Sequence, residues 1–434
     1  MNTFTNLKYL TIVLAISLTG FACSSSSSSD GESTATINGS VEESQQQKLK
    51  QNSTAGVIVT AGRVNSNGSV EAINGVQTET NASGNFSLEV DAESTQHLVI
   101  MAENQGTTWK GYLSGEIENG NSYTLKPINS ESSAEAEIFA NLVASGGADI
   151  VNKADVESTV SSEVATEIQG NTSTASTIAA GLINAAEARA EFYSEMMSSN
   201  AQAALEATSE SMSEAQFRLE SELDASTSAE QRADAYNVFV ESVVNAYLNA
   251  GLDASSSAKA IEVWSRTYVN STASTSSEVR ESTRKNTSLL VASAIDGAIR
   301  TEAEASGMSE SSIQAIVDSG VQLRSEIKAS SGVDSEIKAA FETYHEEVRT
   351  TMENDGSFEA SVIVEIDSKI NASGGAKATF ETAVSALTNA SIVVNVYQTF
   401  YAGVRSTVET MLSGASEAEI NAVTELMILA NVAS

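Results

Sequence analysis

The sequence is poor in the residues that build disulfides, metal centres and thiol-based catalytic sites. Its 434 residues include one cysteine, Cys23, and two histidines. A single cysteine excludes an internal disulfide framework and a cysteine zinc site. If Cys23 is consumed by an anchor, as the residues around it indicate, a cysteine nucleophile is excluded as well. We expect no cofactor and no bound metal.

Proline, aromatic residues and positive charge are also scarce. Pro127 is the only proline, aromatics make up 5% of the chain, and 23 Lys and Arg face 57 Asp and Glu, for a net charge of −34. A lack of proline is typical of long helices. Negative charge spread along the chain repels nucleic acid, so we expect no nucleic-acid partner. We interpret the charge as surface solvation rather than as a site for a basic partner.

The N-terminus has the pattern of a secretory signal. Lys8 precedes an apolar stretch, Leu10 to Ala22, which is too short to span a membrane. Gly20 and Phe21 stand three and two residues before Cys23. The segment resembles the bacterial lipobox, although that family usually has Leu and a small residue at those two places. The resemblance implies a signal peptide at 1–22, acylation of the Cys23 thiol and Cys23 as the first mature residue.

Residues 23–34 are predicted to form a flexible tether. Ser24 to Ser29 are six consecutive serines, and the residues that follow them have almost nothing apolar to bury. A plain cleaved signal with a spare cysteine and an uncleaved anchor helix are alternatives, but both leave this run unexplained. In the lipoprotein family, Ser24 after the cysteine implies the outer membrane, with either a periplasmic or a cell-surface face.

Residues 35–128 show the alternation and punctuation of strands. Phe86, Leu88 and Val90 alternate with polar residues, which gives one buried and one wet face. Asn74-Gly75 predicts a tight turn. About seven such strands indicate a small antiparallel β-sandwich.

Part of this region is similar to a known family. Ile37 to Val41, Ala61-Gly62 and Thr80 to Leu88 resemble the carboxypeptidase regulatory-like domains, with a Gly-x-Val opening and a turn that ends in a packing phenylalanine. The resemblance implies a non-catalytic sandwich module. Asn81 stands where the family often has an acid, which argues against calcium at this turn.

Residues 129–434 contain no proline and have apolar residues at helical spacing. Ile178, Leu182, Ala185, Phe192 and Met196 form one stripe, and Leu205 to Leu223 continue it with a shift near 198–200. Several glycines fall where helix C-caps belong, and Ser309, Ser335 and Ser416 are candidate N-terminal signals. We predict further helices at 229–250, 257–305, 309–330, 334–353, 358–372, 376–412 and 416–432.

No catalytic constellation stands out. His97 is predicted to pack within a strand, and His345 to lie on a solvated acidic helix face near Glu342. Neither fits the zinc motif H-E-x-x-H. Another set of residues could contact a ligand by stacking on it, although core packing is the alternative for them: Trp109, Tyr112 and Tyr123. Five more aromatics are predicted to pack inside the helical bundle: Tyr236, Phe239, Tyr247, Trp264 and Tyr268.

We therefore predict an α+β multidomain protein, a small antiparallel β-sandwich followed by a large, mostly α-helical bundle. The expected function is that of a lipid-anchored, non-enzymatic protein of the cell envelope with a structural or interaction role. Its partners would be the membrane, through the anchor, and an envelope protein or glycan. The alternatives are a surface carbohydrate- or peptide-binding lipoprotein and, from another class, a hydrolase that uses acidic residues.

Overall fold

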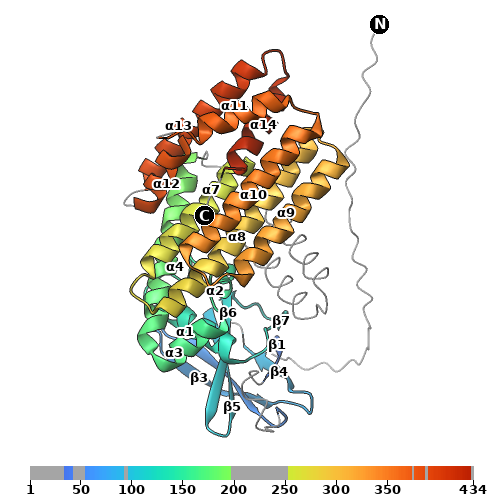
Figure 1. Ribbon diagram of the computed structural model, residues 1–434. Helices are drawn as coiled ribbons and strands as arrows, with labels where there is room; N and C mark the ends of the chain where they lie inside the picture. The colour runs from blue at the N-terminus through green and yellow to red at the C-terminus, as the bar shows by residue number, and fades with distance from the viewer. Residues whose placement is uncertain are drawn as a thin grey trace. The chain divides into compact units, whose positions relative to one another are not determined.

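The computed structural model describes residues 34–42, 54–91, 96–196, 253–373, 376–386 and 390–431 (Figure 1). Strands come first and helices follow, which confirms the predicted α+β class. Residues Thr34–Ser434 form one compact unit, and Met1–Ser33 are assigned to another. Cys23, the tether, the predicted helix at 229–250 and the stripe from Leu205 onward lie outside the described residues. So do three of the predicted core aromatics, Tyr236, Phe239 and Tyr247.

Two sheets form the sandwich. The three-stranded sheet has the order β4-β1-β7 and the four-stranded sheet the order β3-β2-β5-β6. All pairs are antiparallel except β1 with β7, which is parallel, so the predicted antiparallel sandwich is correct for the other pairs only. Apolar residues of both sheets meet in one core between them. The strands are β1 (Ala35–Ser40), β2 (Ile58–Val64), β3 (Val70–Glu79), β4 (Asn85–Val90), β5 (Gln96–Asn104), β6 (Thr107–Glu116) and β7 (Ser122–Thr124).

The turn predicted at Asn74-Gly75 is wrong. Strand β3 runs through it, and Ala61 of β2 alone lies opposite residues 73–76, because Thr60 pairs with Gln77 and Gly62 with Ala72. Gly75 has φ of 80°. A bulge needs this left-handed backbone as a turn does, so the Asn-Gly pattern indicates both. The β2–β3 turn lies instead at residues 65–69.

The predicted turn with a packing phenylalanine is confirmed. The side-chain carbonyl of Asn81 accepts hydrogen bonds from the backbone N–H groups of Ser83 (2.9 Å) and Asn85 (3.0 Å). Phe86, directly after the turn, is buried against Gly39 of β1. A Cβ at Gly39 would lie 2.7 Å from the ring, so the phenylalanine needs a glycine beside it.

Most predicted helices are present, with corrected bounds. The segment predicted as one helix at 257–305 is two, because the hydroxyl of Thr272 bonds to the carbonyls of Tyr268 and Val269 and Ser276 caps the next helix. The segment at 376–412 is also two. The helices are α1 (Ser130–Ala144), α2 (Lys153–Glu157), α3 (Ser162–Gly170), α4 (Thr172–Met196), α7 (Ala254–Ser271), α8 (Ser277–Ala305), α9 (Glu310–Ala329), α10 (Asp334–Asp355), α11 (Ala360–Ile370), α12 (Ala376–Ala386), α13 (Ala390–Met411) and α14 (Glu417–Leu429).

The predicted helix ends are largely confirmed. The glycines at 307, 332, 356 and 414 have positive φ. Ser309 caps α9, and Ser416 forms a capping box with Glu419 at the start of α14. Ser335 does not begin a helix: α10 starts at Asp334, and Val333 is its N-cap without a side-chain bond.

A second core joins the four-stranded sheet to the helices. Helix α1 packs on β6 (Figure 1). There Phe139 stacks on Tyr112, with ring centroids 4.6 Å apart. The same apolar cluster includes Val99 of β5, and Trp264 and Tyr268 of α7. Three residues of the predicted stripe of α4 belong to it, Ile178, Leu182 and Ala185, whereas Phe192 and Met196 pack in the core of the later helices. Both predicted core aromatics of α7 are thus confirmed as packing residues. The domain boundary between residues 128 and 129 stays a prediction.

The later helices share a core of their own, and a buried ion pair connects two of them, α8 and α9. Asp296 of α8 is fully buried and pairs with Arg324 of α9 at 2.7 Å and with Arg300. The Tyr344 hydroxyl of α10 donates to Oδ1 of Asp296 at 3.3 Å. Burial, and then the Asp296 charge, raises the pKa of Tyr344 well above its usual value. Gly320 of α9 faces this carboxylate, and a Cβ there would lie 2.2 Å from Oδ1.

This contact predicts opposite effects for two helical glycines. Gly320→Ala should lower the free energy of unfolding by about 1–3 kcal/mol, because the methyl group collides with a buried carboxylate. Gly403→Ala in α13 has open space around its Cβ and should raise it by about 0.5–1 kcal/mol through helix propensity. Chemical denaturation of the two variants measures both. Equal effects would contradict the close packing of α9 on Asp296.

Candidate functional site

The structure separates the three aromatic residues predicted to contact a ligand. Trp109 is 8% exposed and packs between the two sheets, whereas Tyr112 is 2% exposed and faces α1 on the other side of β6. Tyr123 of β7 is half-buried, and its hydroxyl accepts a hydrogen bond from the backbone N–H of Glu118 at 2.9 Å. These rings share no common exposed face, so packing explains them better than stacking on a ligand.

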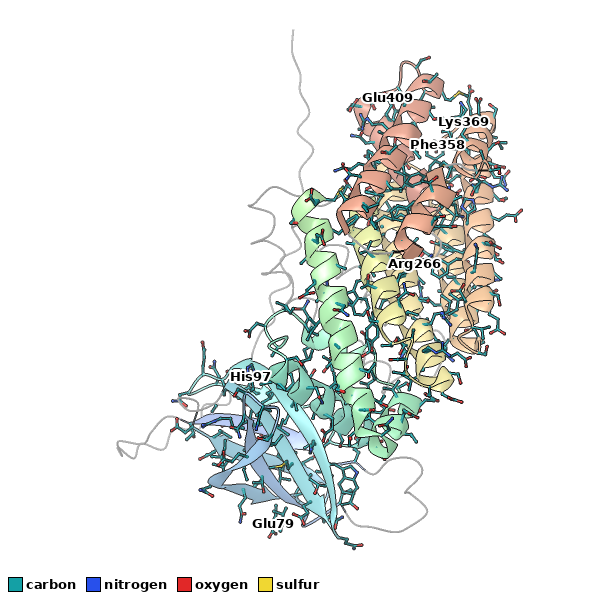
Figure 2. All side chains as sticks on the ribbon, turned by 90° about the vertical axis from the view of Figure 1, so that its left-hand side faces the viewer. Glu79, His97, Arg266, Phe358, Lys369 and Glu409 are labelled. Carbon is teal, nitrogen blue, oxygen red and sulfur yellow. The ribbon has the colours of Figure 1, made fainter. Side chains whose placement is uncertain are left out.

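Each histidine is held by its neighbours. His97 lies at the register shift of β5 with φ of 59°, where the sheet meets the helices, and its ring packs edge-on against Phe139 (Figure 2). The packing prediction for His97 is confirmed. The solvated-face prediction for His345 is wrong, since its side chain is 15% exposed and its Nε2 lies 2.9 Å from Oδ1 of Asp367 in α11. Bonding from His345 and the charge of Arg349 hold the pKa of Asp367 low despite burial.

A cavity of about 740 Å³ lies between the three-stranded sheet and the first helices. We call it the β1–α1 cavity. Its lining comes from the end of β1 and residue 42, the start of β4, residues 124–129, the first turns of α1, Glu157 of α2, and Val160. Residues from six parts of the chain therefore converge on one hollow, of the size of a small-molecule site.

Buried charges form one wall of the β1–α1 cavity. Lys126 Nζ lies 3.5 Å from Glu135 Oε1 and 3.3 Å from Glu157 Oε1. Lys153 Nζ approaches the same Glu157 oxygen at 3.4 Å. The Glu157 and Glu135 side chains are 1% and 7% exposed, and that of Lys126 is 16% exposed. Carboxylates this deeply buried require partners, and the two Lys126 pairs tie α2 and α1 to the segment after β7, whereas the Lys153 pair lies within α2.

The start of α1 is set by a local signal that the sequence carries. Asn129 accepts hydrogen bonds from the N–H groups of Glu131 and Ser132, and the Ser132 hydroxyl accepts from the Asn129 N–H in a capping box. The Ser132 hydroxyl also donates to the carbonyl of Lys110 in β6 at 2.8 Å. This cap fixes where α1 begins and so places Glu131 and Glu135 at the cavity.

Helix α2 is a short element held by side chains on three sides. Asp155 forms a two-point pair with Arg189 of α4, at 3.0 Å and 2.8 Å. Lys153 lies over the Tyr112 ring, 5.5 Å from its centroid. With the Glu157 contacts, five residues are enough to connect the sheet, α1 and α4.

A second polar cluster surrounds the start of α7. Asp253 caps the helix through the Ser256 N–H at 2.7 Å, and Glu425 of α14 accepts from the Ser255 N–H at 2.8 Å. The hydroxyls of Ser255 and Tyr397 share a hydrogen bond of 2.7 Å. Burial, and then the Asp253 charge, raises the pKa of Glu425 to about 7. The same two causes raise the pKa of Glu302 in α8 to about 7.

Comparison with known proteins found no family model, no curated protein and no solved structure that matches this chain. The resemblances to lipoproteins and to the carboxypeptidase regulatory-like domains therefore stay predictions. In the part of the chain that the structure describes, no helix is long and apolar enough to cross a membrane. Within that same part, no group of three or more His, Cys, Asp or Glu residues could hold a metal ion.

Sequence reasoning missed Lys126, Glu135 and Glu157. One local signal was present, because Lys153 and Glu157 have the i,i+4 spacing of a helical ion pair. Lys126 directly precedes the only proline, and it is one of only 23 cations. Among 57 acids, however, nothing local marks two glutamates as buried.

The cluster at α7 predicts a pH-dependent stability. Below about pH 4.5, Glu425 is protonated in both the folded and the unfolded chain, and above about pH 7 in neither. Between these values only the folded chain keeps the proton, so the free energy of unfolding falls as pH rises. Glu425→Gln removes the contribution of this carboxyl group to the pH dependence. The free energy of unfolding of the variant should be roughly 2 kcal/mol higher than that of the wild type at pH 8 and equal to it at pH 4. Glu302 supplies the slope that remains.

Urea denaturation at several pH values between 4 and 8 measures this difference. Glu342→Gln is a matched control, because it removes the same charge from an exposed position of α10. A constant offset between Glu425→Gln and the wild type at every pH would contradict the raised pKa.

Proposed function

We propose that this chain is a lipid-anchored protein of the bacterial outer membrane with a non-catalytic, structural or interaction role. The observation that carries the proposal is the apolar core that the four-stranded sheet shares with α1, α4 and α7. The sandwich follows a flexible anchor and packs directly onto helices. The sandwich and these helices would therefore behave as one rigid body. Such a rigid body is suited to presenting an interaction surface, or to keeping a fixed distance, at the cell envelope.

The charges at this contact support the same role. Lys126, Arg189 and Lys153 each pair with a carboxylate of α2 or α1. The Lys126 and Arg189 pairs connect elements that are distant in the sequence, whereas the Lys153 pair lies within α2. None of these pairs places a histidine, serine or cysteine beside a base. We therefore assign these buried charges to joining elements rather than to catalysis.

The carbohydrate- or peptide-binding alternative, as built on Trp109, Tyr112 and Tyr123, is not part of the proposal. That form of the alternative required Trp109 and Tyr112 to form an exposed patch, and these two rings are buried on opposite faces of β6. The hydrolase alternative needs two carboxylates that converge in a pocket. Glu425 and Glu302 have raised pKa values beside Asp253, but none of these three residues lines the β1–α1 cavity.

The anchor is tested in cells. Cys23→Ala should abolish incorporation of a labelled fatty acid and shift the protein from the membrane to the soluble fraction, because no thiol is left to acylate. Ser25→Ala, two residues further along the same segment, is the matched control and should behave as the wild type. Membrane retention of Cys23→Ala would contradict lipidation.

The two tryptophans of the chain, Trp109 and Trp264, test whether the sandwich and the helices form one body. Trp109 lies in the core between the sheets and Trp264 in the core shared with the helices. Trp264→Phe leaves a reporter in the sandwich, and Trp109→Phe leaves one in α7. In each variant the fluorescence transition should coincide with the loss of helical circular dichroism, because the shared core couples the two regions. In the variant that keeps Trp109, a fluorescence transition separate from the helical one would contradict the proposal.

A further inference from the structure

Four Asn-Gly sequences occur in the chain, and all of them lie in the strands of the sandwich or in its turns: Asn38-Gly39, Asn67-Gly68, Asn74-Gly75 and Asn119-Gly120. Asparagine is among the thermolabile residues of proteins, and a following glycine, which has no Cβ, leaves its side chain accessible to the backbone. The glycine nitrogen attacks Cγ of the asparagine and forms a C–N bond. The bond from Cγ to Nδ2 breaks, and ammonia leaves with the glycine N–H proton. Water then opens the succinimide ring to give aspartate or isoaspartate.

Asn38-Gly39 is held within the three-stranded sheet. It lies in β1, which pairs with β4 on one side and with β7 on the other. The Asn38 side chain donates a hydrogen bond to the Ser122 hydroxyl at 3.0 Å. A Cβ at Gly39 would lie 2.7 Å from the Phe86 ring, so this backbone has little room to turn.

Hydrogen bonds hold two further sites, Asn67-Gly68 and Asn119-Gly120. The side-chain carbonyl of Asn67 accepts a hydrogen bond from the Ser69 N–H at 3.0 Å. The Gly68 N–H donates to a backbone carbonyl of the same turn at 2.8 Å, and the Gly120 N–H donates to the Thr34 carbonyl at 3.1 Å. In both sites the nitrogen that would attack is therefore already engaged.

Asn74-Gly75 is less restrained. Both residues are exposed, and the Asn74 side chain has no hydrogen-bond partner among the described residues. Strand β3 ends the order of its sheet, and its residues 73–76 lie opposite Ala61 of β2 alone. Gly75 has φ of 80°, and no described atom beyond its chain neighbours lies within 4 Å of where a Cβ would be. The backbone at this bulge can therefore move without displacing a neighbour.

We propose that Asn74 is a self-modification site, at which the folded protein converts asparagine to aspartate or isoaspartate. Ring closure requires Asn74 to leave its extended conformation so that the Gly75 nitrogen reaches Cγ. In β3 this motion takes place in a bulge and not in a regular ladder. The other three sites must first open hydrogen-bonded or packed backbone, which costs free energy before the reaction can begin. This inference concerns the sandwich alone and does not depend on where the protein is anchored.

The bulge also tolerates the products. Isoaspartate adds one methylene group to the main chain, and residues 73–76 are already out of register with β2, so no ladder pair is shifted. Both products add a carboxylate, which stays in water because position 74 is exposed. The modified chain is therefore expected to keep its fold.

Peptide mapping by mass spectrometry tests the proposal on the full-length chain, incubated at mildly alkaline pH. Conversion of an asparagine raises the mass of its peptide by about 1 Da. In the folded protein, Asn74 should react at least about tenfold faster than each of the other three sites, because those sites react only after local opening. In the chain unfolded by urea, the four sites should react at similar rates, which is the control for the shared dipeptide.

Two variants of the result would overturn the proposal. The first is a rate at Asn74 in the folded protein that is no higher than at another of the four sites. The second is a product that contains aspartate but no isoaspartate, because only opening of the ring formed with Gly75 gives isoaspartate. Asn74→Gln should abolish the fast reaction, since ring closure then needs a larger ring. Circular dichroism before and after the incubation checks that the chain stays folded.

Discussion

The burial of one face of the four-stranded sheet beneath α1 is the contact on which the rest of the structure depends. Tyr112 and Phe139 stack at its centre, and the same apolar cluster continues into α4 and α7. A sheet face of this kind must be covered to be stable in water. Because helices cover it, the sandwich and the first helices are one packed structure, and the β1–α1 cavity lies at the edge of that contact.

Scarce positive charge is the second constraint. With 23 cations for 57 acids, the chain cannot pair most of its carboxylates. Several of its cations lie at contacts between elements: Lys126 beside α1 and α2, Arg189 on α2, and Arg324 on Asp296 of α8. Lys259 of α7 is buried as well, with Glu262 at 2.9 Å and the Phe380 ring at 4.1 Å, and burial lowers its pKa. Breaking one of these pairs would leave a buried charge, which is why they hold elements in place.

Some buried carboxyl groups are stabilised by means other than a cation. Glu425 and Glu302 keep their protons up to about pH 7, and Glu425 accepts the Ser255 N–H at the start of α7. This arrangement makes stability depend on pH, and it follows from burying acids in a chain with few bases.

The sequence by itself determined the local features. Alternation around Phe86, the capping box at Ser416 and the glycines that end helices all act within one strand or one turn, so they can be read from neighbouring residues. The tertiary structure alone decided which charges meet. Asp296 and Arg324 are 28 residues apart, and Glu425 reaches Ser255 across 170. It also turned Asn74-Gly75 into a bulge, because the pairing of β2 with β3, and not the dipeptide, selects between two uses of the same backbone conformation.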